Sequence, residues 1–375
     1  MALYIGLMSG TSLDAIDAVL IELSPAEEVK LLAHHTERFD PALQESLRTL
    51  LHTAHCHLSQ LGQLDIKLGY AYAQTVQRLL AVANVSAAQI DGIGCHGQTI
   101  FHEPDSAYPF SMQIGNGNVI AETTGITTVC DFRQRDIVNG GQGAPLVPAF
   151  HAAMFAAKNK QRAIINIGGI SNISVLAAGS ATVVHGFDIG PGNILMDTWS
   201  QLHLQKDYDN EGLWAKSGQV NDALLLTLKS DPYFSRSIPK STGRELFNQS
   251  WLQQQLRLAG ATTLAAADIQ ATLLAFTAST IADAIHKYAH QVEEVYVCGG
   301  GARNTALMQA LSAALKDKTV DTTAAIGLDP QWVEAMAFAW LAAQTLQHKK
   351  IDLQQITGAR RPSILGAVYW SRKLS

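Results

Sequence analysis

Short apolar runs recur along the chain and alternate with segments of helical periodicity. Residues 3–8 and 18–23 are two such runs on either side of the small-residue stretch Ser9-Gly10-Thr11-Ser12. This pattern predicts a strand, a turn and a returning strand. Between residues 58 and 82 the apolar positions lie three or four residues apart, which predicts an amphipathic helix. Two further short, buried strands are predicted at residues 90–95 and 126–130.

The pattern begins again near residue 162. Residues 163–167 and 173–176 are apolar runs on either side of Gly168-Gly169, so they again predict a strand, a turn and a returning strand. Further strands are predicted at 183–189 and 294–298, and helices at 148–157, 266–289, 304–315 and 332–346. The repetition indicates an internal duplication of one α/β unit. We therefore predict an N-terminal lobe of residues 1–160 and a C-terminal lobe of residues 161–375, with a cleft between them.

Composition narrows the class of protein. Of 375 residues, 47% are hydrophobic and 16% are charged, and the net charge is −5. These values exclude a disordered chain, and they argue against a dedicated binder of nucleic acids or anionic membrane surfaces, which needs a basic face. No apolar stretch reaches the ~20 residues that span a bilayer, and no signal peptide is expected. The four cysteines form no C-x-x-C pair, which predicts reduced thiols and a cytoplasmic location.

Three glycine-containing turns follow predicted strands: Ser9 to Ser12, Gly168-Gly169 and Gly299-Gly300-Gly301. Backbone N–H groups at such turns can hold phosphate oxygens. Any one of them is better explained as an ordinary hairpin turn, but three at strand ends, in matching positions of two half-repeats, favour a nucleotide site. The chain has no G-x-x-x-x-G-K-[ST], and no G-x-G-x-x-G opens a first βαβ unit, so a P-loop protein is excluded and a dinucleotide fold is disfavoured.

Five segments carry a resemblance to a known family. They are residues 6–17 (GLMSGTSLDAID), 95–99 (CHGQT), 131–133 with 140–145 (DFR and GGQGAP), 166–172 (NIGGISN) and 186–193 (GFDIGPGN). Together they resemble the anhydro-N-acetylmuramic acid kinases, and the resemblance extends from Leu3 to about Val368. It implies the actin, Hsp70 and sugar-kinase fold, a two-lobed α/β ATPase with a central nucleotide and substrate cleft. It also implies ATP and Mg²⁺ as cofactors, and a homodimer.

The family converts 1,6-anhydro-N-acetylmuramic acid, water and ATP into N-acetylmuramic acid 6-phosphate during cell-wall (peptidoglycan) recycling. Water attacks C1 while O6 leaves and takes the γ-phosphoryl group, so a carboxylate must remove a proton from the water. The resemblance implies that this catalytic base is Asp188. From the residues alone, Asp188 ends an apolar strand where α/β folds bind ligands, but a helix N-cap or turn acid explains it equally well.

The expected contacts fall into two sets. The nucleotide-binding set is Gly10, Thr11, Ser12, Leu13, Asp14, Ala15, Ile16, Asp17, Gly168, Gly169, Gly299, Gly300 and Asn304. The substrate-binding set is His96, Gln98, Asp131, Arg133 and Glu334. The fork of Arg133 suits a carboxylate such as the lactyl group, although a surface pair with Asp131 fits as well. Glu334 is equally a first-turn acid that favours the helix dipole.

Three questions stay open at this level. Asp14 and Asp17, three apart on the predicted returning strand, point to opposite faces, and the individual Mg²⁺ ligand is not assigned. Ala15 stands where the family usually has glycine, so the returning strand is expected to be less tightly turned. Two other functions also fit the fold, a kinase for another hexosamine and an actin- or Hsp70-like ATPase. The two kinase hypotheses require a sugar for ATP turnover, whereas the ATPase hypothesis does not.

Overall fold

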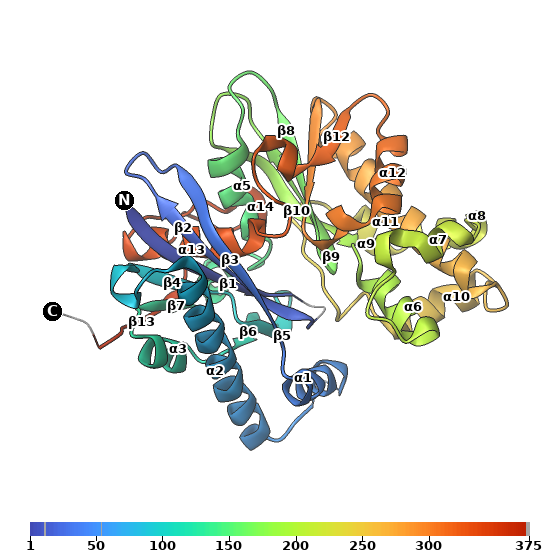
Figure 1. The fold of residues 1–375 in the computed structure, drawn as a ribbon. Helices are drawn as coiled ribbons and strands as arrows, with labels where there is room; N and C mark the ends of the chain where they lie inside the picture. Colours follow the sequence, from blue (N-terminus) through green and yellow to red (C-terminus); the bar gives the residue numbers. More distant parts are fainter. Residues whose placement is uncertain (11–12, 54, 373–375) are drawn as a thin grey trace. The chain divides into compact units, whose positions relative to one another are not determined.

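The protein is described from a computed structural model, which covers residues 1–10, 13–53 and 55–372. The chain forms two compact units, Met1–Met154 with Trp332–Ser375, and Phe155–Gln331. Figure 1 traces the chain from its blue N-terminus to its red C-terminal segment. This division differs from the expected pair of contiguous lobes, 1–160 and 161–375, because the C-terminal segment returns to the first unit.

A six-stranded sheet forms the centre of the first unit, in the order β13-β7-β4-β1-β2-β3. Its strands are β1 (Ala2–Ser9), β2 (Ala15–Leu23), β3 (Val29–Arg38), β4 (Gly92–Cys95), β7 (Thr128–Cys130) and β13 (Ala367–Tyr369). A separate hairpin consists of β5 (Gln98–Glu103) and β6 (Phe110–Ile114). The predicted first hairpin is confirmed, because β1 and β2 pair antiparallel, whereas β4 and β7 continue the sheet in parallel with β1.

The helices of the first unit pack around this sheet. They are α1 (Pro41–Thr53), α2 (Leu58–Ala83), α3 (Gly117–Thr124), α4 (Gln134–Val138), α5 (Val147–Phe155), α13 (Val333–Leu346) and α14 (Gln354–Thr357), with the 3₁₀ turn η1 (Ala87–Gln89). Helix α2 buries the apolar stripe that the sequence predicted, including Leu64, Leu68 and Tyr72, in one core with β1 and β2. The predicted helices at 58–82, 148–157 and 332–346 are therefore confirmed.

Helix α13 lies directly on the strands of this sheet. A Cβ atom at Gly6 of β1 would lie 1.8 Å from the carbonyl oxygen of Ala335, and one at Gly94 of β4 would lie 1.9 Å from that of Phe338. The absence of both side chains lets the helix backbone approach the two strands. Because α13 is buried along almost its whole length, this contact holds the C-terminal segment on the first unit.

The second unit repeats the strand order of the first. Its sheet, β10-β9-β8-β11-β12, consists of β8 (Arg162–Ile167), β9 (Ile170–Leu176), β10 (Val183–Pro191), β11 (Glu294–Cys298) and β12 (Thr319–Thr322). Read from the other edge, β12-β11-β8-β9-β10 matches β7-β4-β1-β2-β3 strand for strand, with the same parallel and antiparallel pairings. The predicted internal duplication is thus confirmed at the level of topology.

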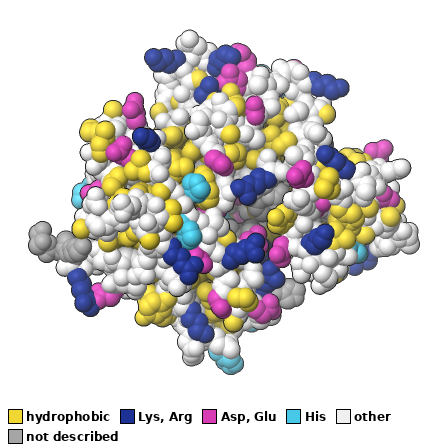
Figure 2. All heavy atoms as spheres, in the orientation of Figure 1, with side chains coloured by type: hydrophobic (Ala, Val, Ile, Leu, Met, Phe, Trp, Pro, Cys, Tyr) yellow, Lys and Arg dark blue, Asp and Glu magenta, His cyan; other side chains and the backbone are white. Residues whose placement is uncertain are grey.

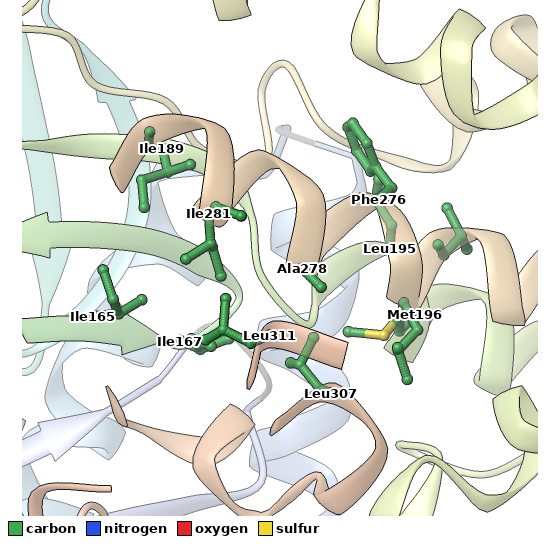
Figure 3. Packing of buried hydrophobic residues seen from close by; sticks show 14 of the residues in the cluster. Ile165, Ile167, Ile189, Leu195, Met196, Phe276, Ala278, Ile281, Leu307 and Leu311 are labelled. Atoms are coloured by element: carbon green, nitrogen blue, oxygen red, sulfur yellow. The ribbon is translucent and has the colours of Figure 1, made fainter. Parts of the chain in front are cut away.

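The helices of the second unit cover one face of its sheet. They are α6 (Ile194–Leu204), α7 (Leu213–Ser217), α8 (Asp222–Lys229), α9 (Pro232–Ser235), α10 (Gln249–Leu258), α11 (Ala266–Tyr288) and α12 (Thr305–Ala314), with the 3₁₀ turns η2 (Asn210–Gly212), η3 (Gly300–Arg303) and η4 (Thr323–Ile326). Figure 3 shows Ile165 and Ile167 of β8 packed with Ile281 of α11 and Leu311 of α12. Since side chains alternate along a strand, Asn166 faces the other side of the sheet.

On the face drawn in Figure 2, side chains of both charge signs are intermixed. None of the helices in the described part of the chain is long and apolar enough to cross a membrane. All four cysteines are free, and Cys95 and Cys298, which end apolar runs, are buried.

Replacement of Gly94 tests the contact between α13 and the sheet. Gly94→Ala should lower the free energy of unfolding by about 3 kcal/mol or more, because the new methyl group meets helix backbone rather than a flexible side chain. Gly62→Ala is the control, since nothing lies within 4 Å of a Cβ at this position in α2, and it should stabilise the protein by up to ~1 kcal/mol. Urea unfolding measures both. Equal midpoints for the two variants would show that the contact adapts freely.

Candidate functional site

The turn between β8 and β9 in the second unit is bound to the start of α6. The amides of Gly192 and Asn193 each donate a hydrogen bond of 2.8 Å, to the carbonyls of Gly169 and Gly168 respectively. The amide of Ile194 donates to the Gly169 carbonyl at 3.1 Å. The predicted nucleotide residues Gly168 and Gly169 are thereby fixed against the junction that follows the Asp188 strand.

The three glycines after β11 differ in their surroundings. Gly299 has a φ of +77°, and a Cβ there would lie 2.4 Å from Asn166 Oδ1. A Cβ at Gly301 would lie 2.3 Å from the side chain of Ile167. Gly300 is exposed, and the nearest atom to a Cβ there would be the side-chain nitrogen Nδ2 of Asn193, 3.7 Å away. Gly299 and Gly301 are therefore required by packing, and Gly300 is the position at which a ligand can approach bare backbone.

Asn304, the remaining nucleotide residue of this unit, caps a helix. Its Oδ1 accepts a hydrogen bond of 3.0 Å from the amide of Leu307 at the start of α12. The side-chain oxygen is thus already bound within the protein. A contact between Asn304 and the nucleoside stays a prediction.

Asp188 belongs to a row of residues that crosses the second sheet. On neighbouring strands, Asp188 is paired with Asn172, Asn172 with Asn166, and Asn166 with Cys298. The row lies on the sheet face opposite Ile165 and Ile167, and all four members are buried. The N-cap alternative for Asp188 is wrong, because the N-cap of α6 is Asn193.

A loop beyond the edge strand β10 holds Asp188 in place. The Asp188 amide donates to the carbonyl of Lys240 at 3.1 Å, and the amide of Thr242 donates to Asp188 Oδ2 at 3.1 Å. The hydroxyl of Tyr233 donates to the Asp188 carbonyl at 2.6 Å. Backbone and carboxylate are therefore both constrained, as a group that must meet a reacting atom requires.

A buried cation lies near this carboxylate. Lys240 Nζ donates to the carbonyl of Tyr233 at 3.0 Å and lies 4.3 Å from the centre of its ring. Burial, together with the positive charges of Lys287 and Arg236, lowers the pKa of Lys240 to about 8, while the negative charge of Asp188 opposes the shift. The sequence analysis missed Lys240 and Thr242. Their only signal in the sequence is the short polar run after Pro239, which belongs to none of the five family segments.

The first glycine turn is described only in part, since Thr11 and Ser12 lie outside the described residues. Leu13 is buried with a φ of +60°, and its amide donates to the carbonyl of Gly10 at 3.3 Å. Leu13 is therefore a residue of this turn with a left-handed backbone conformation. Ala15 begins β2 in a regular pair with Arg38, so no positive φ is needed where the family usually has glycine.

The two acids and the isoleucine of this turn take different positions. Asp14 precedes β2 and does not lie on it, which corrects the prediction that both acids share the strand. Asp17 lies on β2, and its Oδ1 accepts a hydrogen bond of 2.6 Å from the hydroxyl of Thr36. Ile16 is buried in the core of the first unit. Within the described ranges, no cluster of three or more His, Cys, Asp or Glu residues could hold a metal ion.

Two predicted substrate residues of the first unit are in direct contact. Arg133 donates to His96 Nε2 from Nε at 3.2 Å and from Nη2 at 2.9 Å, and its Nη1 donates to the Gly143 carbonyl at 2.8 Å. Burial lowers the pKa of His96 well below its ordinary value, and the charge of Arg133 acts in the same direction. His96 is therefore neutral. Because Nε2 accepts, its proton is on Nδ1.

The remaining substrate residues lie close to this pair. His96 and Asp131 line a pocket of about 460 Å³ at the ends of β4 and β7, together with Asp65, Gln113 and Asn116. Asp131 has a φ of +52° directly after β7. Glu334 lies in the first turn of α13, one turn before Phe338, whose ring centre is 4.7 Å from that of His96.

Gln98 has a partner in the first strand. Its Oε1 accepts a hydrogen bond of 2.8 Å from the hydroxyl of Ser9, which also bonds with the hydroxyl of Tyr72 at 2.6 Å. Gln98 therefore connects β5 to the end of β1, directly before the first glycine turn. The hydroxyl of Tyr72 was not anticipated, because its helix appeared only as an apolar stripe.

Comparison with known proteins decides which family this arrangement represents. The family model described as "Anhydro-N-acetylmuramic acid kinase" matches residues 2–371. The chain belongs to the anhydro-N-acetylmuramic acid kinase family. Two relatives carry that name, one from Coxiella burnetii (strain Dugway 5J108-111), 44% identical over 372 residues, and one from Shewanella pealeana, 48% identical over 366 residues. These alignments cover 99% and 98% of this chain, and 98% of each relative.

A solved structure supports the fold. Component A of the (R)-2-hydroxyglutaryl-CoA dehydratase of Acidaminococcus fermentans matches with a TM-score of 0.50 at 11% identity, over 92% of this chain and 100% of that chain. At this identity the likeness shows the fold alone. Membership of the anhydro-N-acetylmuramic acid kinase family and the predicted α/β fold of the actin, Hsp70 and sugar-kinase type are both confirmed.

Gly300 provides a test of the nucleotide site. Gly300→Val should fold normally, because its Cβ would make only an ordinary van der Waals contact, 3.7 Å from Asn193 Nδ2, and should bind ATP about ten- to a hundredfold more weakly. The control is Gly260→Asn, which adds a side chain to another exposed glycine of the same unit that has nothing within 4 Å of its Cβ. Calorimetry with ATP measures both variants. Wild-type affinity in a folded Gly300→Val protein would place the nucleotide elsewhere.

The protonation state of His96 can be tested by nitrogen NMR of histidine-labelled protein. The His96 signals, assigned by their loss in His96→Gln, should report the neutral Nδ1–H form and should not change as the pH falls through the ordinary histidine pKa of about 6.5. Folding lowers the pKa of His96. The stability that the burial of neutral His96 and the charge of Arg133 link to pH is therefore complete above the unfolded pKa of about 6.5 and is lost as the pH falls towards the folded value. Titration of His96 near pH 6.5 would contradict the assignment.

Proposed function

We propose that the protein is an ATP-dependent kinase that opens 1,6-anhydro-N-acetylmuramic acid with water and phosphorylates O6, giving N-acetylmuramic acid 6-phosphate and ADP. The observation that carries the proposal is the buried carboxylate of Asp188, held by the Thr242 amide on the edge strand of the second sheet. The relatives of the same name, 44% and 48% identical over nearly the whole chain, support this choice of substrate.

In the proposed reaction Asp188 is the general base. Its carboxylate takes one proton from the attacking water while the water oxygen bonds to C1 and the C1–O6 bond breaks. The released O6 bonds to the γ-phosphorus, and the bond between that phosphorus and the leaving ADP oxygen breaks. The charge of the nearby Lys240 favours the ionised form of Asp188 at neutral pH, which a base needs.

Each unit has its own proposed nucleotide contacts. Gly168, Gly169 and Gly300 would supply backbone at which ATP can approach closely, and Gly10 and residues 13–17 would do so at the first turn. Mg²⁺ would neutralise charge on the phosphates. Asp14, in the turn before β2, would be its protein carboxylate, because Asp17 already accepts a hydrogen bond from Thr36 and magnesium needs only one or two carboxylates.

We further propose that the sugar contacts His96, Gln98, Asp131, Arg133 and Glu334. Two contacts support this proposal. The fork of Arg133 holds His96 and the Gly143 carbonyl, and the neutral His96 keeps a donor on Nδ1. That donor suits an acceptor oxygen of the sugar. With the family resemblance, the same proposal includes a place in peptidoglycan recycling, a cytoplasmic location and a homodimer.

A coupled assay with three arms tests the function. ATP should be consumed with 1,6-anhydro-N-acetylmuramic acid, and neither N-acetylglucosamine nor ATP alone should support comparable turnover. Preference for N-acetylglucosamine would identify another hexosamine kinase, and sugar-independent turnover would identify an actin- or Hsp70-like ATPase. Product formed in ¹⁸O-water and quenched early should carry the label at C1, because water is the nucleophile.

Asp188→Asn tests the proposed base. The amide has nearly the same size but cannot accept the proton at neutral pH, so turnover should fall by about 10²–10⁴-fold or more. Melting temperature and sugar binding should stay close to wild type. Asp222→Asn, at an exposed acid in the first turn of α8, is the matched control and should keep full turnover. Near-wild-type activity of a folded Asp188→Asn protein would remove Asp188 from the mechanism.

A further inference from the structure

Two buried polar side chains beside Asp188 each have an oxygen atom without a hydrogen-bond partner among the described residues. Asn172 is 9% exposed and Thr242 is 8% exposed. Neither Asn172 Oδ1 nor Thr242 Oγ1 has a hydrogen-bond partner among the residues that the structure describes. Burial of an unsatisfied polar atom is unfavourable, and nearly all buried polar atoms in folded proteins are paired. Their position beside the proposed base therefore points to a bound ligand.

The two groups flank Asp188 from opposite sides of its strand. Asn172 is the register partner of Asp188 on β9, so the two side chains lie on the same face with Cβ atoms about 5 Å apart. Thr242 belongs to the loop beyond the edge strand, and its amide already donates to Asp188 Oδ2 at 3.1 Å. The Thr242 hydroxyl oxygen is three covalent bonds from that amide nitrogen, so it also lies within a few ångströms of the carboxylate.

The chemistry of the three groups selects a small neutral ligand. A carboxylate only accepts hydrogen bonds, whereas a hydroxyl and a carboxamide can both donate and accept. A phosphate oxygen at this position would face the negative charge of Asp188, which is unfavourable. Water can donate to the carboxylate and also bond with the hydroxyl and the carboxamide, and it is small enough for a buried site.

We propose that Asn172 and Thr242 hold the water that Asp188 deprotonates. The inference rests on the proposed function, in which this water attacks C1. One proton passes to Asp188, the other stays on the new C1 hydroxyl, C1–O6 breaks, and O6 takes the γ-phosphoryl group as ADP leaves. Asn172 and Thr242 orient the water oxygen, so they touch a reacting atom without exchanging a proton with it.

Thr242→Val tests the proposal, because it removes the hydroxyl and keeps the amide that holds Asp188. Turnover with the anhydro sugar should fall about ten- to a hundredfold. The KM values for ATP and sugar, the sugar affinity by calorimetry and the melting temperature should change little. Thr242→Ser restores a hydroxyl and should recover most of the activity. Asn172→Leu, of similar size, should lower turnover in the same way.

Thr323→Val is the matched control. Thr323 is also a buried threonine of the second unit whose hydroxyl has no partner among the described residues, but it follows β12, at the opposite edge of the sheet from β10. This variant should keep wild-type turnover, since its hydroxyl is remote from Asp188. Equal turnover of Thr242→Val and Thr323→Val would overturn the proposal.

Two further outcomes separate the competing explanations. A raised sugar KM with unchanged kcat in Thr242→Val would show that the hydroxyl binds the sugar, and would also overturn the proposal. If Asn172→Leu does not fold, the Thr242 series still decides. Failure of the wild-type protein to use the anhydro sugar would instead contradict the proposed function, so the two failures are distinguishable.

Discussion

Helix α13 can lie on the first sheet only because Gly6 and Gly94 have no side chains. Any Cβ at either position would overlap the backbone of the helix. The approach brings Phe338 against His96, and His96 in turn accepts the fork of Arg133. Two strands, a helix and a predicted substrate residue thus depend on one contact between backbones. A larger residue at these positions would disturb the core and the pocket together.

The two copies of the duplicated sheet differ in the burial of their edge strands. In the first unit the edge strand β3 alternates half-buried and exposed positions along its whole length. In the second unit the corresponding edge strand, β10, is buried over most of its length, and the Lys240–Thr242 loop lies beyond it. Covering the edge moves Asp188 away from bulk water and provides partners for its backbone and carboxylate. The same topology therefore gives an open edge in one unit and, in the other, a covered edge beside the proposed base.

Burial and charge act against each other around Asp188. Burial alone would raise the pKa of a carboxyl group and leave it protonated, which would disable a base. The Thr242 amide and the charge of Lys240 favour the ionised form of Asp188, whereas burial lowers the pKa of Lys240 to about 8. The pair is consistent with a base that works in a site from which most water is excluded.

The sequence alone determined the local features. Alternation of apolar runs predicted the hairpins and the repeated unit, and contiguous motifs indicated the family, the glycine turns and Asp188. These features need only neighbouring residues, because a strand, a turn or a motif is specified within a few positions. For the same reason, the predicted helices end within two residues of the observed ones, and the predicted strands within three.

Tertiary structure alone decided which distant residues meet. The return of α13 to the first unit depends on glycines about 240 to 330 positions earlier in the chain, and Arg133 meets His96 across 37 residues. Asn172 and Thr242 converge on Asp188 from a neighbouring strand and from a loop 54 residues later. Such contacts leave no periodicity in the sequence, since strand pairing and packing relate residues by register and shape. Which glycine is open to a ligand, and which polar atoms lack partners, therefore follows only from the fold.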